Sequence, residues 1–111
     1  MVTEFVISRK EWLRGEGMRN SALLRKSDGK RCCVGIFARA CGAPDASIID
    51  RVWPRRWDRW APEWLFQEEE FFESYDSLAA VNDKTDLPDA ERERVIAAMF
   101  AAQGITVTFT D

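Results

Sequence analysis

Tryptophan and arginine side chains alternate over residues 51–64. The tryptophans recur at intervals of four, three and four residues: Trp53, Trp57, Trp60 and Trp64. The arginines stand between them: Arg51, Arg55, Arg56 and Arg59. Indole rings stack on bases or fill pockets in a protein surface, and guanidinium groups hold phosphates or carboxylates. This stretch therefore combines two side-chain types that are well suited to binding.

Three interpretations of the stretch fit its spacing. In the first, helical spacing places the rings in the core and leaves the arginines in water, paired with the glutamates of residues 63–73. In the second, the stretch contacts a protein, because tryptophan and arginine are the favoured anchors of protein interfaces. In the third, it binds single-stranded nucleic acid or a nucleotide, although the acidic balance of the whole chain argues against this.

A cost argument favours partial exposure of the stretch. Four tryptophans within twelve residues are more than a small core needs, and each buried ring requires an acceptor for its N–H. Pro44, Pro54 and Pro62 prevent one long helix with a single buried stripe. We expect at least one of Trp57 and Trp60 to be exposed beside an arginine. The predicted partner-binding residues are Arg55, Arg56, Trp57, Arg59 and Trp60.

The chain lacks the residues of common catalytic centres. It contains no histidine, which removes Ser-His and Cys-His pairs, histidine metal ligands and the commonest general base. The three cysteines show no Cys-x-x-Cys spacing, so a zinc site would lack ligands. Cys32 could be a reactive thiol because Lys30 and Arg31 precede it, but a small buried side chain is the simpler interpretation. We predict no enzyme activity, no cofactor and no metal.

Other polar clusters carry weaker signals. The glutamates at 68–70 and 73 are typical of a solvated helix face. Gly15-Glu16-Gly17 lacks the lysine and helix start of a phosphate-binding loop. Residues 82–86 lack the glycine and closing glutamate of a calcium loop and are better interpreted as a turn with a helix cap.

Length and composition predict one intracellular domain spanning residues 1–111. No apolar run approaches the ~20 residues of a membrane span, and residues 1–10 do not resemble a secretion signal. Three cysteines, two of them adjacent, predict reduced thiols and hence a cytoplasmic protein. We expect no membrane partner, and the sequence leaves a homodimer open.

The charge is divided unevenly along the chain. Residues 1–60 hold 13 Lys/Arg and 7 Asp/Glu, whereas residues 61–111 hold 3 and 12. The first part is therefore basic and the second acidic. Folding could bring the two parts together so that they neutralise each other, or leave one basic and one acidic face.

The predicted fold class is α+β, with a small antiparallel sheet covered by several helices. Strands are expected at 4–7 and 105–110, paired with each other because both alternate apolar and polar residues. A short hairpin is expected where residues 21–25 and 30–32 flank an Asp-Gly turn. A first helix is predicted to begin at the Ser8-to-Glu11 capping box and to stop at Gly15. Further helices are predicted over 33–41, 54–60, 62–72 and 77–82, and a last one from an N-cap at Asp86 to about 103.

The segment Cys32-Cys33-Val34-Gly35 resembles one found in a group of small tailed-phage and prophage accessory proteins. Members of that group carry an early tryptophan-containing helix, a short hairpin, a Cys-Cys-Leu-Gly segment that opens a helix, and a later Leu-Ala-x-Leu-Asn-Asp segment. Here the corresponding residues are Trp12 to Gly15, Leu24 to Arg31, Cys32 to Gly35, and Leu78 to Asp83. Valines replace leucines at positions 34 and 81. The resemblance implies a non-structural phage protein that acts on its bacterial host, and it assigns no functional residues.

These observations predict a non-catalytic phage or prophage accessory protein in the bacterial cytoplasm. It would bind and modulate a host protein, for example as an inhibitor of a defence system such as an anti-CRISPR. The alternative is a small nucleotide or single-stranded nucleic-acid binding module that uses the tryptophan and arginine side chains. A small enzyme with a cysteine nucleophile is the third hypothesis.

Overall fold

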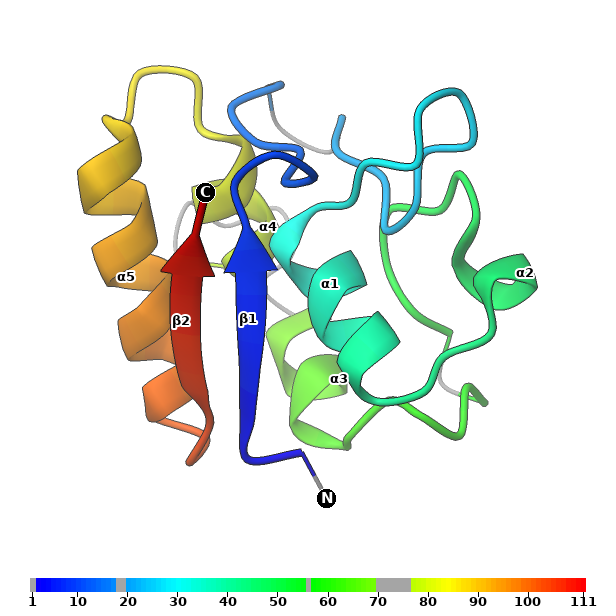
Figure 1. The fold of residues 1–111 in the computed structure, drawn as a ribbon. Coiled ribbons are helices and arrows are strands. Elements are labelled where there is room, and N and C mark those ends of the chain that lie inside the picture. The colour runs from blue at the N-terminus through cyan, green and yellow to red at the C-terminus, as the bar shows by residue number, and fades with distance from the viewer. Residues whose placement is uncertain (1, 18–19, 56, 70–76) are drawn as a thin grey trace.

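The computed structural model contains two strands and five helices, and it describes residues 2–17, 20–55, 57–69 and 77–111. In chain order these elements are β1 (Glu4–Ser8), α1 (Cys33–Ala40), α2 (Asp45–Ile48), α3 (Trp64–Glu69), α4 (Leu78–Asp83), α5 (Asp89–Ala101) and β2 (Thr106–Thr110). The helices lie behind and beside a two-stranded sheet, whose front face is open (Figure 1). Val6, Thr106 and Thr108 are exposed on that open face.

The sheet joins the two ends of the described chain, as predicted, but its strands are parallel. Glu4 pairs with Thr106 and Ser8 with Thr110, and both arrows point the same way in Figure 1. The predicted antiparallel sheet is therefore wrong. Adjacency was predictable from two alternating strands, whereas direction depends on the connection between them, and here that connection contains all five helices.

The docking of α5 explains the parallel direction. Near its start, Arg92 Nη1 donates hydrogen bonds to the carbonyls of Val81 (2.8 Å) and Asn82 (3.0 Å) at the end of α4. Asn82 O also accepts a hydrogen bond from Gly15 N, a few residues beyond the end of β1. The start of α5 therefore lies at the end of β1. A tight turn at Gly104 reverses the chain, so β2 runs alongside β1 in the same direction.

The predicted hairpin at 21–32 is also wrong. Its turn forms, because Arg25 N donates to Lys30 O and Gly29 N donates to Arg25 O, each at 2.8 Å. The two arms pair elsewhere, however. Leu24 bridges Ile49, and Arg31 bridges Trp12. The turn was predictable from its own residues, but the pairing of the two arms depends on segments that are distant in the sequence.

Two predicted helices are absent from the described residues. Around Ser8 to Glu11 the chain makes only a turn, and the Glu11 carboxylate pairs with Arg39 of α1. The described residues between 54 and 60 form turns as well. The predicted helix over 62–72 is observed as α3 over Trp64–Glu69, and residues 70–72 lie outside the described residues. The helices predicted over 33–41 and 77–82, and the last helix, are confirmed as α1, α4 and α5.

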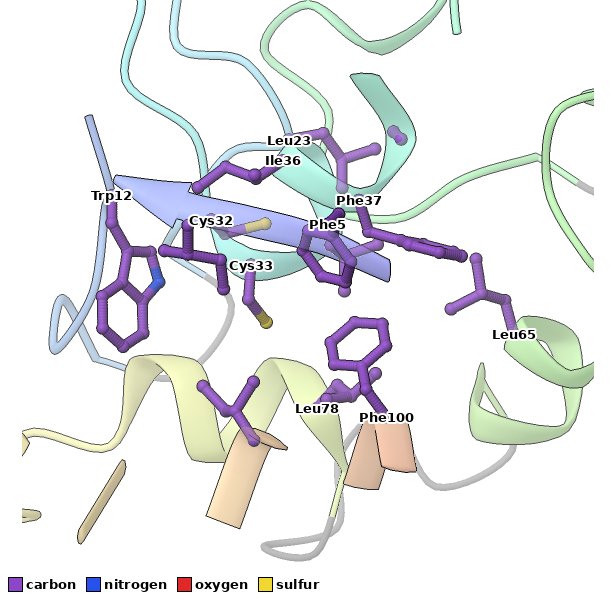
Figure 2. Packing of buried hydrophobic residues seen from close by; sticks show 14 of the residues in the cluster. Phe5, Trp12, Leu23, Cys32, Cys33, Ile36, Phe37, Leu65, Leu78 and Phe100 are labelled. Carbon is purple, nitrogen blue, oxygen red and sulfur yellow. The ribbon is translucent and has the colours of Figure 1, made fainter. Parts of the chain in front are cut away.

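The core lies between the sheet and the helices, around three phenylalanine rings. Phe5 of β1, Phe37 of α1 and Phe100 of α5 have ring centroids 5.0–5.4 Å apart. Figure 2 shows these rings facing one another, with Leu65 and Leu78 contributed by α3 and α4. The core thus draws on both ends of the chain and on its middle.

Gly35 allows α1 to touch the backbone of the preceding segment. A Cβ at this position would lie 1.8 Å from the carbonyl oxygen of Leu23. The glycine of the Cys-Cys-Val-Gly segment is therefore required by close packing.

Among the described residues, no helix is long and apolar enough to span a bilayer.

Candidate partner-binding face

The tryptophan and arginine stretch begins as part of the core. Trp53 is buried, and the carbonyl of Arg51 accepts a hydrogen bond from Leu23 N at 2.6 Å. Arg51 Nη2 donates to the carbonyl of Trp53 at 3.1 Å. These contacts fix the position of the chain before it enters the turns at 55–61.

A turn presents Trp57 to solvent. Asp58 N donates to Arg55 O at 3.0 Å, and the Asp58 carboxylate accepts from Arg55 N at 2.8 Å. Trp57 at the tip of this turn is 74% exposed. The guanidinium carbon of Arg55 lies 5.4 Å from the centre of the Trp57 ring, which is cation–π geometry. The prediction that one of these rings is exposed beside an arginine is confirmed.

The next two tryptophans return to the core. Trp64 contacts Phe37 and Phe100, with ring centroids 5.7 and 5.8 Å away. Trp60 is partly buried against the same cluster, and its buried indole N–H finds no acceptor among the described residues. A buried donor without a partner costs about 1–3 kcal/mol. Burial of this indole N–H therefore carries a cost that the apolar contacts of the ring offset.

The predicted site residues accordingly fall into three groups. Trp57, Arg55 and Arg59 are exposed, and Trp60 is partly buried. Arg56 lies outside the described residues, as do Glu70, Glu73 and the side chains of Glu68 and Glu69, so pairing with those glutamates stays a prediction. The core interpretation holds for Trp53 and is wrong for Trp57.

Basic side chains outnumber acidic ones among the described residues around Trp57. The pKa of Arg51 is lowered by its burial and further by the nearby positive charge of Arg55, while Asp58 partly compensates. No ion pair joins Arg51, Arg55 or Arg59 to a carboxylate within the part of the chain that the structure describes. We use the name Trp57 face for Arg55, Trp57 and Arg59.

Folding neutralises the basic part of the chain elsewhere. Arg9 Nε lies 2.8 Å from Glu93 Oε2, and Arg14 Nε lies 3.2 Å from Asp89 Oδ2. These pairs join the basic first part to the acidic second part at the end of the sheet where both strands finish. Among the described residues, this neutralisation is therefore local, and no described carboxylate forms an ion pair at the Trp57 face.

A groove lies where both strands begin, at the end of the sheet opposite to these ion pairs. Its volume is about 690 Å³, which is within the size range of ligand sites. Its walls come from the start of β1, the end of α1, the segment 59–64 and the turn before β2. The described lining residues are Val2, Thr3, Phe37, Cys41, Arg59, Trp60, Ala61, Pro62, Trp64, Gln103, Gly104 and Ile105. Arg59 and Trp60 thus connect the groove to the Trp57 face.

Sequence reasoning missed the buried polar centre of the molecule, which is Asn82. Its Oδ1 accepts hydrogen bonds from Trp12 Nε1 (2.8 Å) and Cys33 N (3.0 Å), and its Nδ2 donates to Leu13 O (3.0 Å). Asn82 is 1% exposed. The available signal was an asparagine within an otherwise apolar helical segment, which is unusual for a buried position.

Burial disfavours a reactive thiolate at Cys32. The three cysteines, all of them described, form no disulfide, and Cys32 and Cys33 are buried. Burial raises the pKa of Cys32 to about 12. The cavity beside it measures about 10 Å³, which is room for a single water molecule and not for a substrate. Within the described residues, no group of three or more histidine, cysteine or acidic side chains could hold a metal ion.

No protein-family model, curated protein or solved structure matches this chain.

Proposed function

We propose that this chain is a non-catalytic binding protein that docks through its Trp57 face on an acidic surface of another protein. The observation that carries the proposal is Trp57 itself. A ring that is 74% exposed, held at the tip of a turn under a guanidinium group, contributes nothing to the core. Such a ring is a typical interface anchor.

Charge supports the choice of an acidic partner. Residues 51–64 contain four arginines against Asp58 and Glu63, and the arginines of the Trp57 face pair with none of the described carboxylates. Such a face steers an acidic surface toward itself and repels a basic one. The resemblance to phage and prophage accessory proteins adds a setting to this chemistry, in which the partner is a protein of the bacterial host, such as a defence component.

Photo-crosslinking tests the proposal. We would replace Trp57 with p-benzoyl-phenylalanine, express the chain in bacteria and identify crosslinked proteins. The matched control places the same probe at Thr108, which is exposed on the open face of the sheet. The proposal predicts a defined product from position 57 that is absent from position 108, and loss of that product when Arg55 and Arg59 become alanine. Equal products from both positions, or none, would contradict it.

The alternative function, binding of a nucleotide or single-stranded nucleic acid, is supported by the same ring, because exposed indoles stack on bases. Titration with a fifteen-residue oligo-dT at low salt separates the two. Stacking would quench the fluorescence of Trp57, and the quenching would disappear in Trp57→Ala. A protein-binding face predicts unchanged fluorescence, since the net charge of −3 opposes polyanion binding.

A further inference from the structure

The groove described above has the chemistry to receive part of the same partner. Its lining is mainly apolar and aromatic, from Phe37, Trp60 and Trp64. Arg59 is the single charged residue among the described residues that line it. An apolar cleft with one cation at its edge suits a side chain that is apolar and flanked by negative charge.

The geometry points to the groove as the anchor pocket for an acidic peptide segment that carries one aromatic or large aliphatic side chain. This inference rests on the proposed function, since Arg59 and Trp60 join the groove to the Trp57 face. The apolar side chain would lie against Trp60 and Trp64, and a neighbouring carboxylate would pair with Arg59. The rings are pre-positioned, because Trp64 is already held by Phe37 and Phe100.

Charge complementarity selects this occupant. Glu4 and Glu63 neighbour lining residues in the sequence, but neither contributes to the lining. A basic peptide would therefore find Arg59 in the groove and no described carboxylate to offset it. A neutral apolar segment would fill the groove but add no counter-charge to Arg59, which pairs with no described carboxylate, so the acidic segment is the best match.

A titration followed by NMR tests the inference directly. The chain is labelled with ¹⁵N-tryptophan, and the indole signals are followed while acetyl-Glu-Phe-Glu-amide is added. The matched control peptide is acetyl-Lys-Phe-Lys-amide. We expect the acidic peptide to shift the signals of Trp60 and Trp64, and the basic peptide to leave them unchanged.

Two variants locate the effect. Thr3→Phe places a ring in the groove from an exposed position on its wall, and it should abolish the shifts, whereas Thr108→Phe on the open sheet face should not. Arg59→Gln should lower the affinity for the acidic peptide about two- to fivefold, which is the usual contribution of an exposed charge pair. Arg59 is exposed, so this variant keeps the test valid if Thr3→Phe does not fold.

The outcomes separate the two proposals. If only the Trp57 signal shifts, the proposal that the groove binds the peptide is wrong, but the proposal for the Trp57 face is unaffected. Equal shifts with both peptides would overturn the acidic specificity, and no shift of Trp60 or Trp64 would overturn the anchor pocket. The crosslinking experiment at Trp57 decides the proposed function independently of these results.

Discussion

At the scale of single residues, Asn82 joins three segments that are far apart in the sequence. Its amide satisfies the Trp12 indole, the first amide of α1 and the Leu13 carbonyl. Asn82→Leu keeps a similar volume but leaves these groups unpaired in the interior. We expect it to lower the free energy of unfolding by about 3 kcal/mol or more, since each unpaired buried group costs about 1–3 kcal/mol.

Urea unfolding would measure this loss. Asn20→Leu is the matched control, because Asn20 is exposed and its side chain donates only to the nearby Glu16 carbonyl among the contacts described. If Asn82→Leu unfolds at the same urea concentration as the wild type, the amide does not hold the segments together.

The three thiols should differ in reactivity. Cys41 is partly buried, and burial raises its pKa above the ordinary value, while the pKa of the fully enclosed Cys32 rises to about 12. In the folded protein, Ellman's reagent should therefore label Cys41 slowly at pH 8 and faster at pH 9. Cys32 and Cys33 should react only after denaturation, giving three thiols in total. Rapid labelling of Cys32 in the native protein would revive the cysteine-nucleophile hypothesis.

At the scale of elements, Gly35 fixes how closely α1 approaches residues 21–24. Helix propensity alone predicts that Gly35→Ala stabilises the protein by about 1 kcal/mol. The contact with the Leu23 carbonyl predicts the opposite sign, because the new Cβ would lie 1.8 Å from that oxygen. We expect a loss of several kcal/mol, on the order of the cost of overpacking a core, measured by thermal unfolding.

The exposed position Ala40 in the same helix supplies the comparison for that change. Ala40→Gly should cost only about 1 kcal/mol, the ordinary propensity difference. If Gly35→Ala stabilises the protein, the backbone at Leu23 moves away from the new Cβ at little cost.

The strand β2 closes the fold. Deletion of residues 105–111 removes Ile105 from the core and Phe109 from its contact with the Trp12 ring, at a centroid distance of 5.2 Å. It also leaves β1 without its partner. We expect the truncated chain to be insoluble on expression, whereas deletion of Asp111 alone should be tolerated because it removes only two exposed contacts, an ion pair with Arg9 and a hydrogen bond from Ser8 Oγ. A soluble, folded truncation would show that β2 is peripheral.

Elements with strong local signals were predictable from the sequence. The alternation of β1 and β2 and the glycine stop after α1 each act within a few residues. The cap of α4 is equally local, since Ser77 Oγ accepts from Ala80 N at 3.1 Å, but Ser77 was predicted as the first residue of that helix and not as its cap. The helix predicted from the capping box at Ser8 does not form. Glu11 instead pairs with Arg39 of α1, a contact that no local sequence pattern indicates. The predicted antiparallel direction of the strands was also wrong because of a long-range contact, since the direction depends on where Arg92 packs α5 against the end of α4.

At the scale of the whole molecule, charge compensation among the described residues differs between the two ends. Arg9 and Arg14 meet the carboxylates of α5 where the strands end, whereas Arg55 and Arg59 remain without described carboxylate partners. Composition showed that the charge was divided, but only folding decides which arginines are compensated. The exposure of Trp57 was predictable from the cost of burying four tryptophan rings in a small core. The groove was not predictable, because its walls come from four separate segments.

The central claim is that the Trp57 face binds a protein partner, and affinity tests it most directly. The dissociation constant of the partner identified by crosslinking would be measured by calorimetry for the wild type, Trp57→Ala and the control Thr108→Ala. The account predicts a loss of about tenfold or more for Trp57→Ala, the size expected for an interface anchor, with an unchanged melting temperature and no loss in the control. An affinity that is the same for the folded Trp57→Ala variant as for the wild type would contradict it.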